Sequence, residues 1–415
     1  MPEKGYKKNL ILYLSLIGFF GIFTTTMAKN PVLPLFVKGM GGSPEVIGII
    51  SAISPLAGIL FSFPVGMLSD RIGKRKILLI SGGVFLTAPL LYLFVSDPWY
   101  LIPVRFFHGL ATAILGPVAS AAIAEAYDET KGEKLGIYSS ATLIGRTLTP
   151  IAGGALISYF MHRGGLFPYK SVYVAAFLAS VPAFLFCFAI KDTGGDYRGK
   201  KSTREEFRDS IRYFLGDGRL VSTALVDMAT YFAFGVFETY LPVYLSDNGF
   251  GAGMIGFIFS LQILSVAITK PFFGRLADRI DKRIQIAVGL TVIGLSMLSL
   301  PFFTDEVPVV VVSLTFGLGM SLSTVATSAY TGDIADKTKL GASMGALSSV
   351  MDVGHSSGPL ITGFVISGFS MRAGFAISFI LCLVVALLFV VFTVLKKHRR
   401  LDENRLWHKI FGVHD

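Results

Sequence analysis

Charged side chains are scarce in this chain. Asp, Glu, Lys and Arg together make up 15% of its 415 residues, whereas hydrophobic residues make up 53%. An ordinary soluble domain carries about 25% charged residues. The shortage of charge excludes a water-soluble globular protein and places most of the chain in lipid.

Cysteine and catalytic motifs are scarce as well. The two cysteines, Cys187 and Cys382, both fall inside apolar runs, which excludes a disulfide framework and a cysteine metal site. The sequence contains no glycine-rich phosphate loop, no His-Glu-x-x-His zinc site and no nucleophile elbow. We therefore expect no enzymatic activity, no cofactor and no bound metal.

Long apolar runs are abundant instead. Each is long enough to cross a bilayer as a helix, which takes about 20 residues. The first run is too long, and too free of a small-residue cleavage site, for a removable signal peptide. We predict an all-α membrane protein with twelve transmembrane helices, at 10–37, 46–67, 77–96, 99–124, 135–161, 171–190, 219–246, 251–273, 284–303, 307–332, 341–369 and 373–395.

The sequence repeats itself 208 residues further on. The matching residues are Gly66, Leu68, Asp70, Arg71, Ile72, Lys74 and Arg75 in the first copy, and Gly274, Leu276, Asp278, Arg279, Ile280, Lys282 and Arg283 in the second. A period of half an apolar chain predicts two like-oriented halves with a site between them. We expect a six-helix bundle over 1–190, a cytoplasmic linker with a short amphipathic helix over 191–218, a second six-helix bundle over 219–395 and a basic tail over 396–415.

The excess of positive charge predicts the orientation. The formal net charge is +10, and most Lys and Arg fall in segments on the same side as the N-terminus. By the positive-inside rule we expect a multi-pass protein of the inner or plasma membrane with both termini in the cytoplasm. Basic runs beside a membrane usually meet anionic lipid headgroups, so we expect lipid contact and no nucleic-acid binding.

Three motifs resemble those of the major facilitator superfamily. The signature loop of the family is resembled by Gly66-x-Leu68-x-Asp70-Arg71-x-Gly73-Lys74-Arg75. Its Arg-x-x-Gln-Gly motif is resembled by Arg105-x-x-His108-Gly109. The motif of its drug/proton antiporter branch is resembled by Gly136, Gly145, Thr149-Pro150 and Gly153-Gly154. The resemblance covers essentially the whole chain. It departs from the family at His108, usually Gln, and at Thr149, usually Gly. It implies a twelve-helix fold of two pseudo-symmetric halves and transport by alternating access.

The resemblance also implies a latch between the halves on the cytoplasmic side, closed when the protein opens outward. A simpler explanation of the same residues is charge that sets the topology. The gating residues are Gly66, Asp70, Arg71, Arg75, Gly274, Asp278, Arg279 and Arg283.

Glycine and proline recur on the fifth and eleventh helices. Glycines let helices approach closely, and each proline removes a backbone hydrogen bond and permits bending. Packing alone would explain the glycines, but their presence in both halves favours a pair of rocking elements. The residues of this packing motif are Gly145, Pro150, Gly154, Gly354, Gly358 and Pro359.

Ionisable side chains inside apolar runs are functional candidates, because lipid makes them costly. Asn30 maps onto Glu238 through the repeat, so we expect the neighbouring Lys29 to lie at the depth of Glu238. Arg105 shares this depth, and a cationic pair facing one carboxylate would form a switchable network. The proton-coupling candidates are Glu238, Asp352, Asp227, Arg105 and His355.

Each of these residues also has a simpler explanation. Lys29 could extend to the membrane surface, Asp227 could pair locally, and Asp352 and His355, one turn apart on a helix, could satisfy each other. Arg146 lies at mid-depth, so we expect it to face a cavity or a carboxylate such as Asp352.

Aromatic residues of the seventh helix can repack around varied amphipathic ligands, although aromatic side chains are equally common facing lipid. The candidates for the substrate cavity are Lys29, Asn30, His108, Arg146, Tyr231, Phe234 and Gln262.

Together these features favour a secondary transporter that exports amphipathic small molecules or drugs in exchange for protons. Protonation of Glu238, Asp352 or Asp227 would bias its two states. The cations Lys29, Arg105 and Arg146 leave open an uptake or exchange carrier for an organic anion, and a non-transporting receptor on the same fold is a third hypothesis. The expected partners are a small-molecule substrate, protons and membrane lipid, and we expect a monomer.

Overall fold

The computed structural model describes residues 4–127, 129–191, 212–336 and 340–395. All regular secondary structure in these ranges is helical. The basic tail and most of the linker, including most of the expected amphipathic helix, lie outside the described residues.

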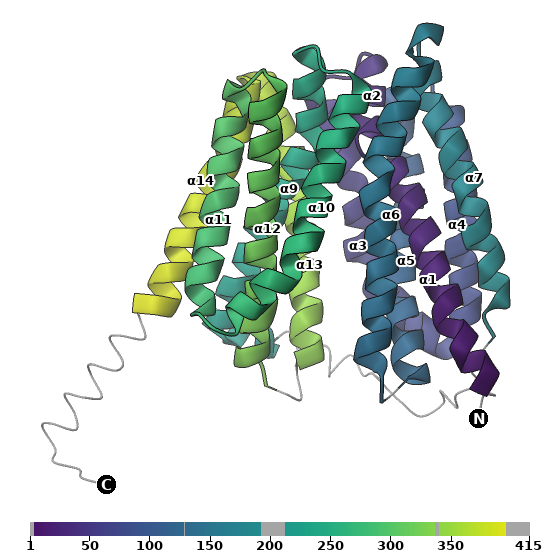
Figure 1. The fold of residues 1–415 in the computed structure, drawn as a ribbon, viewed down its shortest axis with the longest axis vertical. Coiled ribbons are helices and arrows are strands. Elements are labelled where there is room, and N and C mark those ends of the chain that lie inside the picture. Colours follow the sequence, from purple (N-terminus) through teal and green to yellow (C-terminus); the bar gives the residue numbers. More distant parts are fainter. Residues whose placement is uncertain (1–3, 128, 192–211, 337–339, 396–415) are drawn as a thin grey trace, which may run out of the picture.

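Twelve helices of 18 or more residues run side by side in the described part of the chain (Figure 1). They are α1 (Lys4–Met27), α3 (Pro44–Ile72), α4 (Lys74–Leu93), α5 (Leu101–Ala126), α6 (Lys131–Phe160), α7 (Phe167–Ala189), α9 (Gly218–Asp247), α10 (Ala252–Ala277), α11 (Lys282–Ser299), α12 (Glu306–Ile334), α13 (Leu340–Gly368) and α14 (Met371–Val390). Their number agrees with the twelve expected helices.

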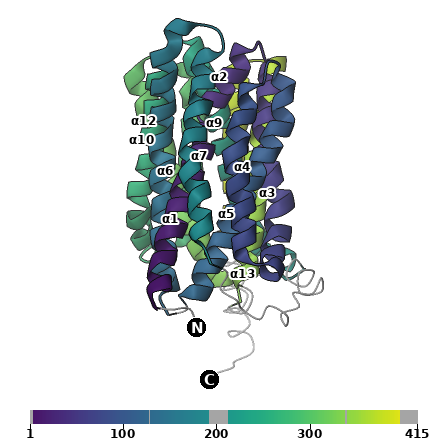
Figure 2. The same cartoon turned by 90° about the vertical axis from the view of Figure 1, so that its right-hand side faces the viewer.

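The helices form two bundles, α1–α7 on the right of Figure 1 and α9–α14 on the left. The bundles contact each other mainly through α3 with α13 and α6 with α10. The N-terminus and the end of α14 lie at the same end of the molecule in Figure 1, and Figure 2 shows the N-terminus at that end again. We call this the terminal end and the opposite end, which carries the short helix α2 (Val32–Gly39), the distal end.

Ten helical segments of the described chain are long and apolar enough to cross a membrane. The two long helices that do not reach this criterion are α6 and α13. Both are rich in Gly, Ser and Thr, and both contact the opposite bundle. Their lower hydropathy follows from lining the boundary between the bundles, where small and polar side chains are tolerated better than in lipid.

The first apolar run, expected as one helix over 10–37, is broken. α1 ends at Met27 and α2 begins at Val32. Pro31 lies between them, and proline lacks the amide hydrogen that a continuing helix requires. The expectation of a single helix is therefore wrong at 28–31. The two helices still form one candidate span, and the break frees Lys29 and Asn30 from regular helix.

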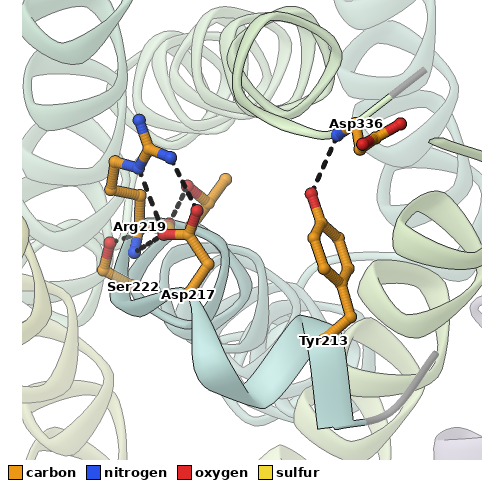
Figure 3. Close-up of polar contacts among 6 residues, drawn as sticks. Tyr213, Asp217, Arg219, Ser222 and Asp336 are labelled. Carbon is orange, nitrogen blue, oxygen red and sulfur yellow. Dashed lines mark hydrogen bonds and ion pairs between the residues drawn. The ribbon is translucent and has the colours of Figure 1, made fainter. Parts of the chain in front are cut away.

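The end of the linker packs onto the C-terminal bundle at the terminal end (Figure 3). Residues 212–216 are helical, and Phe214 is buried against Leu220, Ala335 and Leu347. The hydroxyl of Tyr213 accepts a hydrogen bond from the backbone N–H of Asp336, 2.8 Å away. This short segment therefore ties the start of α9 to the α12–α13 connection.

Asp217 caps the N-terminus of α9. Its carboxylate accepts a hydrogen bond of 2.9 Å from the backbone N–H of Arg219 (Figure 3). It also forms an ion pair of 2.7 Å with the guanidinium of the same residue. The side-chain hydrogen bond from Arg219 lowers the pKa of Asp217.

Candidate functional site at the boundary between the bundles

A buried polar network joins the two bundles near the distal end. Nζ of Lys29 lies 2.5 Å from Oε2 of Glu238 on α9, and Nε2 of His355 on α13 lies 2.8 Å from the same oxygen. Asn30 donates a hydrogen bond to the other carboxylate oxygen. Lys29 Nζ also lies 3.2 Å from His355 Nε2.

The burial of this network explains its composition. The Glu238 side chain is only 7% exposed, and a carboxylate removed from water needs opposite charge and hydrogen bonds in compensation. Lys29 supplies the charge, and Asn30 and His355 supply further polar contacts. Because Lys29 and Asn30 belong to the N-terminal bundle, the network holds the two bundles together at this level.

Arg105, expected to face the same carboxylate as Lys29, lies in a different environment. It is 1% exposed, and Nη1 donates a long hydrogen bond of 3.5 Å to the hydroxyl of Tyr92. The Tyr92 hydroxyl is also 3.3 Å from Nδ1 of His108, and its ring stacks on Tyr173 with centroids 4.3 Å apart. Within the described residues, Nε and Nη2 of Arg105 and Nε2 of His108 have no hydrogen-bond partner.

The two other acidic candidates lie apart from this network. Asp227 is buried and accepts a hydrogen bond of 2.8 Å from Thr327 of α12, which is the local pairing considered for it. Asp352 faces Gly58 of α3 and has no hydrogen bond or ion pair with any described residue. His355 binds Glu238 and not Asp352, so the pairing of those two neighbours is absent.

The remaining cavity candidates lie in different surroundings. The rings of Tyr231 and Phe234 lie beside the imidazole of His355, with centroid distances of 6.3 and 5.4 Å. Gln262 is buried on α10, and its Oε1 has no partner among the described residues. Arg146 is exposed on α6 and forms no hydrogen bond or ion pair with any residue that the structure describes, Asp352 included.

Glycines allow the bundles to touch at the distal end. Gly154 of α6 lies against the backbone of Ala252 and Gly256 on α10, and Gly48 of α3 lies against the backbone of Pro359 on α13. A Cβ atom at any of these glycines would overlap the opposite backbone. Gly145, Gly354 and Gly358 pack instead against a helix of their own bundle. The packing motif therefore serves both kinds of contact.

Polar contacts seal the same end. The hydroxyl of Tyr240 lies 3.0 Å from the carbonyl of Pro44 and 2.8 Å from that of Pro359. Lys38 forms an ion pair of 2.5 Å with Asp247. These groups come from both bundles, so the distal end is closed.

The terminal ends of the same helices are open. A Cβ atom added at Gly136 of α6 or Gly345 of α13 would meet nothing within 4 Å. The close backbone contacts between the bundles, at Gly154 and Gly48, lie toward the distal end. The structure therefore represents a state that is closed distally and open at the terminal end.

The gating motif shows related geometry in its two copies. Lys74 forms an ion pair of 2.5 Å with Glu125, and Lys282 forms one of 2.9 Å with Asp333. Both members of the second pair lie 208 residues after those of the first. The sequence repeat therefore also relates the two acids, Glu125 and Asp333, which were not among the predicted gating residues. Asp278 and Arg279 are exposed. The environment of Gly66 and the side chains of Asp70 and Arg71 are not among the described features.

The turn within the first copy differs in conformation from the turn within the second copy. Gly73 has φ of +97°, a backbone conformation that glycine adopts without strain. Asp281 has φ of −62° and caps α11, and its carboxylate accepts hydrogen bonds from the backbone N–H and the guanidinium of Arg283. Arg283 Nη1 also donates to the carbonyl of Thr393 at 2.6 Å.

Comparison with known proteins decides the family. A family model described as the Major Facilitator Superfamily matches residues 15–254 and 223–412. The chain belongs to the major facilitator superfamily. It is therefore a multi-pass integral membrane transporter and not an enzyme.

Relatives in sequence include proteins named for multidrug resistance. The chain is 23% identical to the multi-drug resistance efflux pump PmrA homolog of Lactococcus lactis subsp. lactis, over 89% of this chain and 90% of that protein. It is 26% identical to the multidrug resistance protein MdtG of Klebsiella pneumoniae, over 90% of each. The resemblance to the drug/proton antiporter branch is thus supported along nearly the whole length.

Solved structures agree in fold. A bacterial homologue of the human lysosomal transporter Spinster, in an inward-facing and unoccupied conformation, superposes with a TM-score of 0.75 at 15% identity, covering 94% of this chain and 96% of that one. The nucleoside transporter NupG gives a TM-score of 0.77 at 13% identity, covering 92% and 98%. At such identity the likeness concerns the fold alone.

Proposed function

We propose that this protein exports amphipathic small molecules in exchange for protons by alternating access. The observation that carries the proposal is the ion pair between Lys29 and Glu238, which crosses the boundary between the bundles at the closed end. A carboxylate in this position can bind a proton only when the pair opens, so protonation and opening are coupled. The names of the multidrug relatives support export of drug-like molecules.

The direction of exchange follows if the terminal end faces the cytoplasm, as the positive-inside rule favours. The state described here then takes up substrate from the cytoplasm. Opening of the distal end separates Lys29 from Glu238, and the carboxylate takes a proton from outside while substrate leaves. When the distal end closes again, Lys29 returns to Glu238 and favours the ionised carboxylate, so the proton leaves toward the only open side.

His355 and Asp352 provide the inward route for this proton. Nε2 of His355 touches the Glu238 carboxylate, its side chain is 16% exposed, and Asp352 lies about one turn nearer the terminal end of α13. A proton can therefore pass from Glu238 to the open side without crossing the sealed end. Both bundles belong to one chain, so we propose that a monomer is the working unit.

Flux in proteoliposomes tests the proposal. With Glu238→Gln, uptake of a fluorescent amphipathic substrate driven by an imposed proton gradient should be lost, while substrate binding persists, because the amide cannot exchange a proton. Glu45→Gln is the matched control, since Glu45 also contacts the opposite bundle at the distal end, through Ser367. Full gradient-driven flux with Glu238→Gln would remove Glu238 from the mechanism and leave Asp352 as the coupling carboxylate.

The same assay addresses the alternatives. A carrier that takes up or exchanges an organic anion would show anion countertransport without dependence on the proton gradient. A receptor on this fold would bind ligand and show no flux.

A further inference from the structure

Two cationic side chains between the bundles have no counter-charge among the residues that the structure describes. Arg146 lies on α6 of the N-terminal bundle and Lys270 on α10 of the C-terminal bundle, and both are exposed. Neither forms a hydrogen bond or an ion pair with any residue that the structure describes. An ionised side chain within a membrane protein is normally paired or lines a water-filled path.

The positions of both residues on their helices exclude exposure to lipid. On α6, the strongly exposed apolar residues Ile144 and Leu148 mark the lipid-facing side, and Arg146 lies two residues from each. On α10, Ile268 and Phe272 mark that side, and Lys270 again lies midway between them. Two residues correspond to about 200° around a helix. Arg146 and Lys270 therefore point away from lipid, into the space between the bundles.

The two cations are close enough to influence each other. The positive charge of Arg146 interacts electrostatically with Lys270, and also with Tyr231 and His355. The carboxylates that act on Tyr231 are Asp227, which accepts a hydrogen bond from Thr327, and Asp352, on which the cation Lys29 acts. Glu238 is already bound to Lys29. No acid in the described part of the chain neutralises Arg146 or Lys270.

We infer that the substrate carries an anionic group, of the carboxylate, sulfonate or phosphonate class, which binds between Arg146 and Lys270. This inference rests on the proposed transport function and specifies the class of amphipathic substrate. The guanidinium of Arg146 suits two parallel hydrogen bonds to an oxyanion, and the ammonium of Lys270 adds a point charge. The apolar part of the substrate contacts Tyr231 and Phe234, whose rings lie beside His355.

The arrangement also gives the substrate a role in the conformational change. Arg146 and Lys270 belong to opposite bundles, and closure of the terminal end brings α6 and α10 together there. Two like charges approaching in a partly dehydrated space repel each other. An anion between them removes the repulsion and adds attraction to both bundles, so the occupied protein closes more readily than the empty one.

A pair of matched probes tests this inference on the full-length protein in detergent. One probe is a dansyl-labelled eleven-carbon carboxylate, and the other is the same dansyl chain ending in trimethylammonium. Fluorescence titration should show tighter binding of the carboxylate by at least about tenfold, equivalent to about 1.4 kcal/mol. Arg146→Gln and Lys270→Gln should each weaken carboxylate binding by about tenfold, and the double variant should lose the preference for the carboxylate.

Controls keep the test decisive if a variant folds poorly. Arg146→Lys retains the charge and should keep most of the preference, whereas Arg163→Gln removes an exposed cation of the distal end and should change nothing. Equal carboxylate affinity in wild type and the double variant, or tighter ammonium binding by wild type, would overturn the inference. Because binding in detergent needs no proton gradient, this outcome is separate from a failure of Glu238→Gln to uncouple transport.

Discussion

The two ends of the boundary between the bundles use the same helices in opposite ways. At the distal end, Gly154 and Gly48 bring α6 and α3 into backbone contact with α10 and α13. At the terminal end, Gly136 and Gly345 on two of these helices have empty space beside them. Packing in this one state explains Gly154 and Gly48 but not Gly136 and Gly345. We expect the two open glycines to make contacts in an alternate state, in which the bundles have rocked about the middle.

The largest effect is expected from breaking the buried ion pair. Lys29→Met leaves the Glu238 carboxylate buried with only neutral partners, and removal of one member of a buried pair typically costs about 3–5 kcal/mol. The closed distal end should lose that stabilisation, and the population should move toward the distal-open state. Distances between spin labels across the distal ends of the bundles measure this shift. Lys38→Met, which breaks an exposed pair at the same end, should have little effect.

Steric changes on one helix should act in opposite directions. Gly154→Val places a side chain against the backbone of α10 and should open the distal end, because overpacking costs about 1–3 kcal/mol. Gly136→Val meets nothing in the state described here and should favour it, by obstructing closure of the terminal end. The same labels report both variants. Shifts of equal sign would contradict the rocking of α6 between two contacts.

Removing the cap of α9 should have a smaller effect, on the stability of the fold. It should leave the ratio of distal-closed to distal-open protein unchanged. Asp217→Ala removes the N-cap and should lower the stability by about 1 kcal/mol. The pKa of Asp217 is lowered in the folded protein, so its contribution is present above the ordinary Asp pKa of about 4. This contribution is lost as the pH falls through the lower pKa that Asp217 has in the folded protein. Thermal unfolding of wild type and Asp217→Ala between neutral and acidic pH should therefore converge at the acidic end.

The gating motif should show the smallest effect in the state described here. Asp278 is exposed and has no partner among the described residues, so Asp278→Asn removes nothing from this state. Any latch that it forms exists when the terminal end closes, and the variant should raise the distal-closed population modestly. We expect Asp70→Asn to have the larger effect, because Asp281 engages Arg283 in the second copy. Label distances across the terminal ends compare the two, and an equal or larger shift from Asp278→Asn would contradict this asymmetry.

The repeat accounts for most of what the sequence could predict. It indicated two halves, and it placed Lys29 at the depth of Glu238 through the match of Asn30 with Glu238. It could also have indicated the Lys282–Asp333 pair from Lys74 and Glu125, since all four residues obey one offset. That relation was missed because acids at helix ends are common and carry no motif of their own.

Other features depend on packing that no local pattern encodes. The choice of His355 as a partner of Glu238 requires α9 and α13 to meet at one height, and the reach of Lys29 requires the break at Pro31. Arg105 contacts Tyr92 and not Glu238, and the Tyr92 ring stacks on Tyr173. Hydropathy gives the depth of such residues but not their partners.

The most direct test is a pair of distances measured in one protein by double electron–electron resonance. Labels at Met161 and Asn248 report the distal end, and labels at Glu133 and Arg275 report the terminal end. All four positions are exposed, and the two native cysteines are buried. In wild type at neutral pH the distal distance should be short and the terminal distance long, and in Glu238→Gln the first should lengthen as the second shortens. Distances that stay unchanged, or that change in the same direction, would contradict a switch in which Lys29 and Glu238 hold the distal end closed.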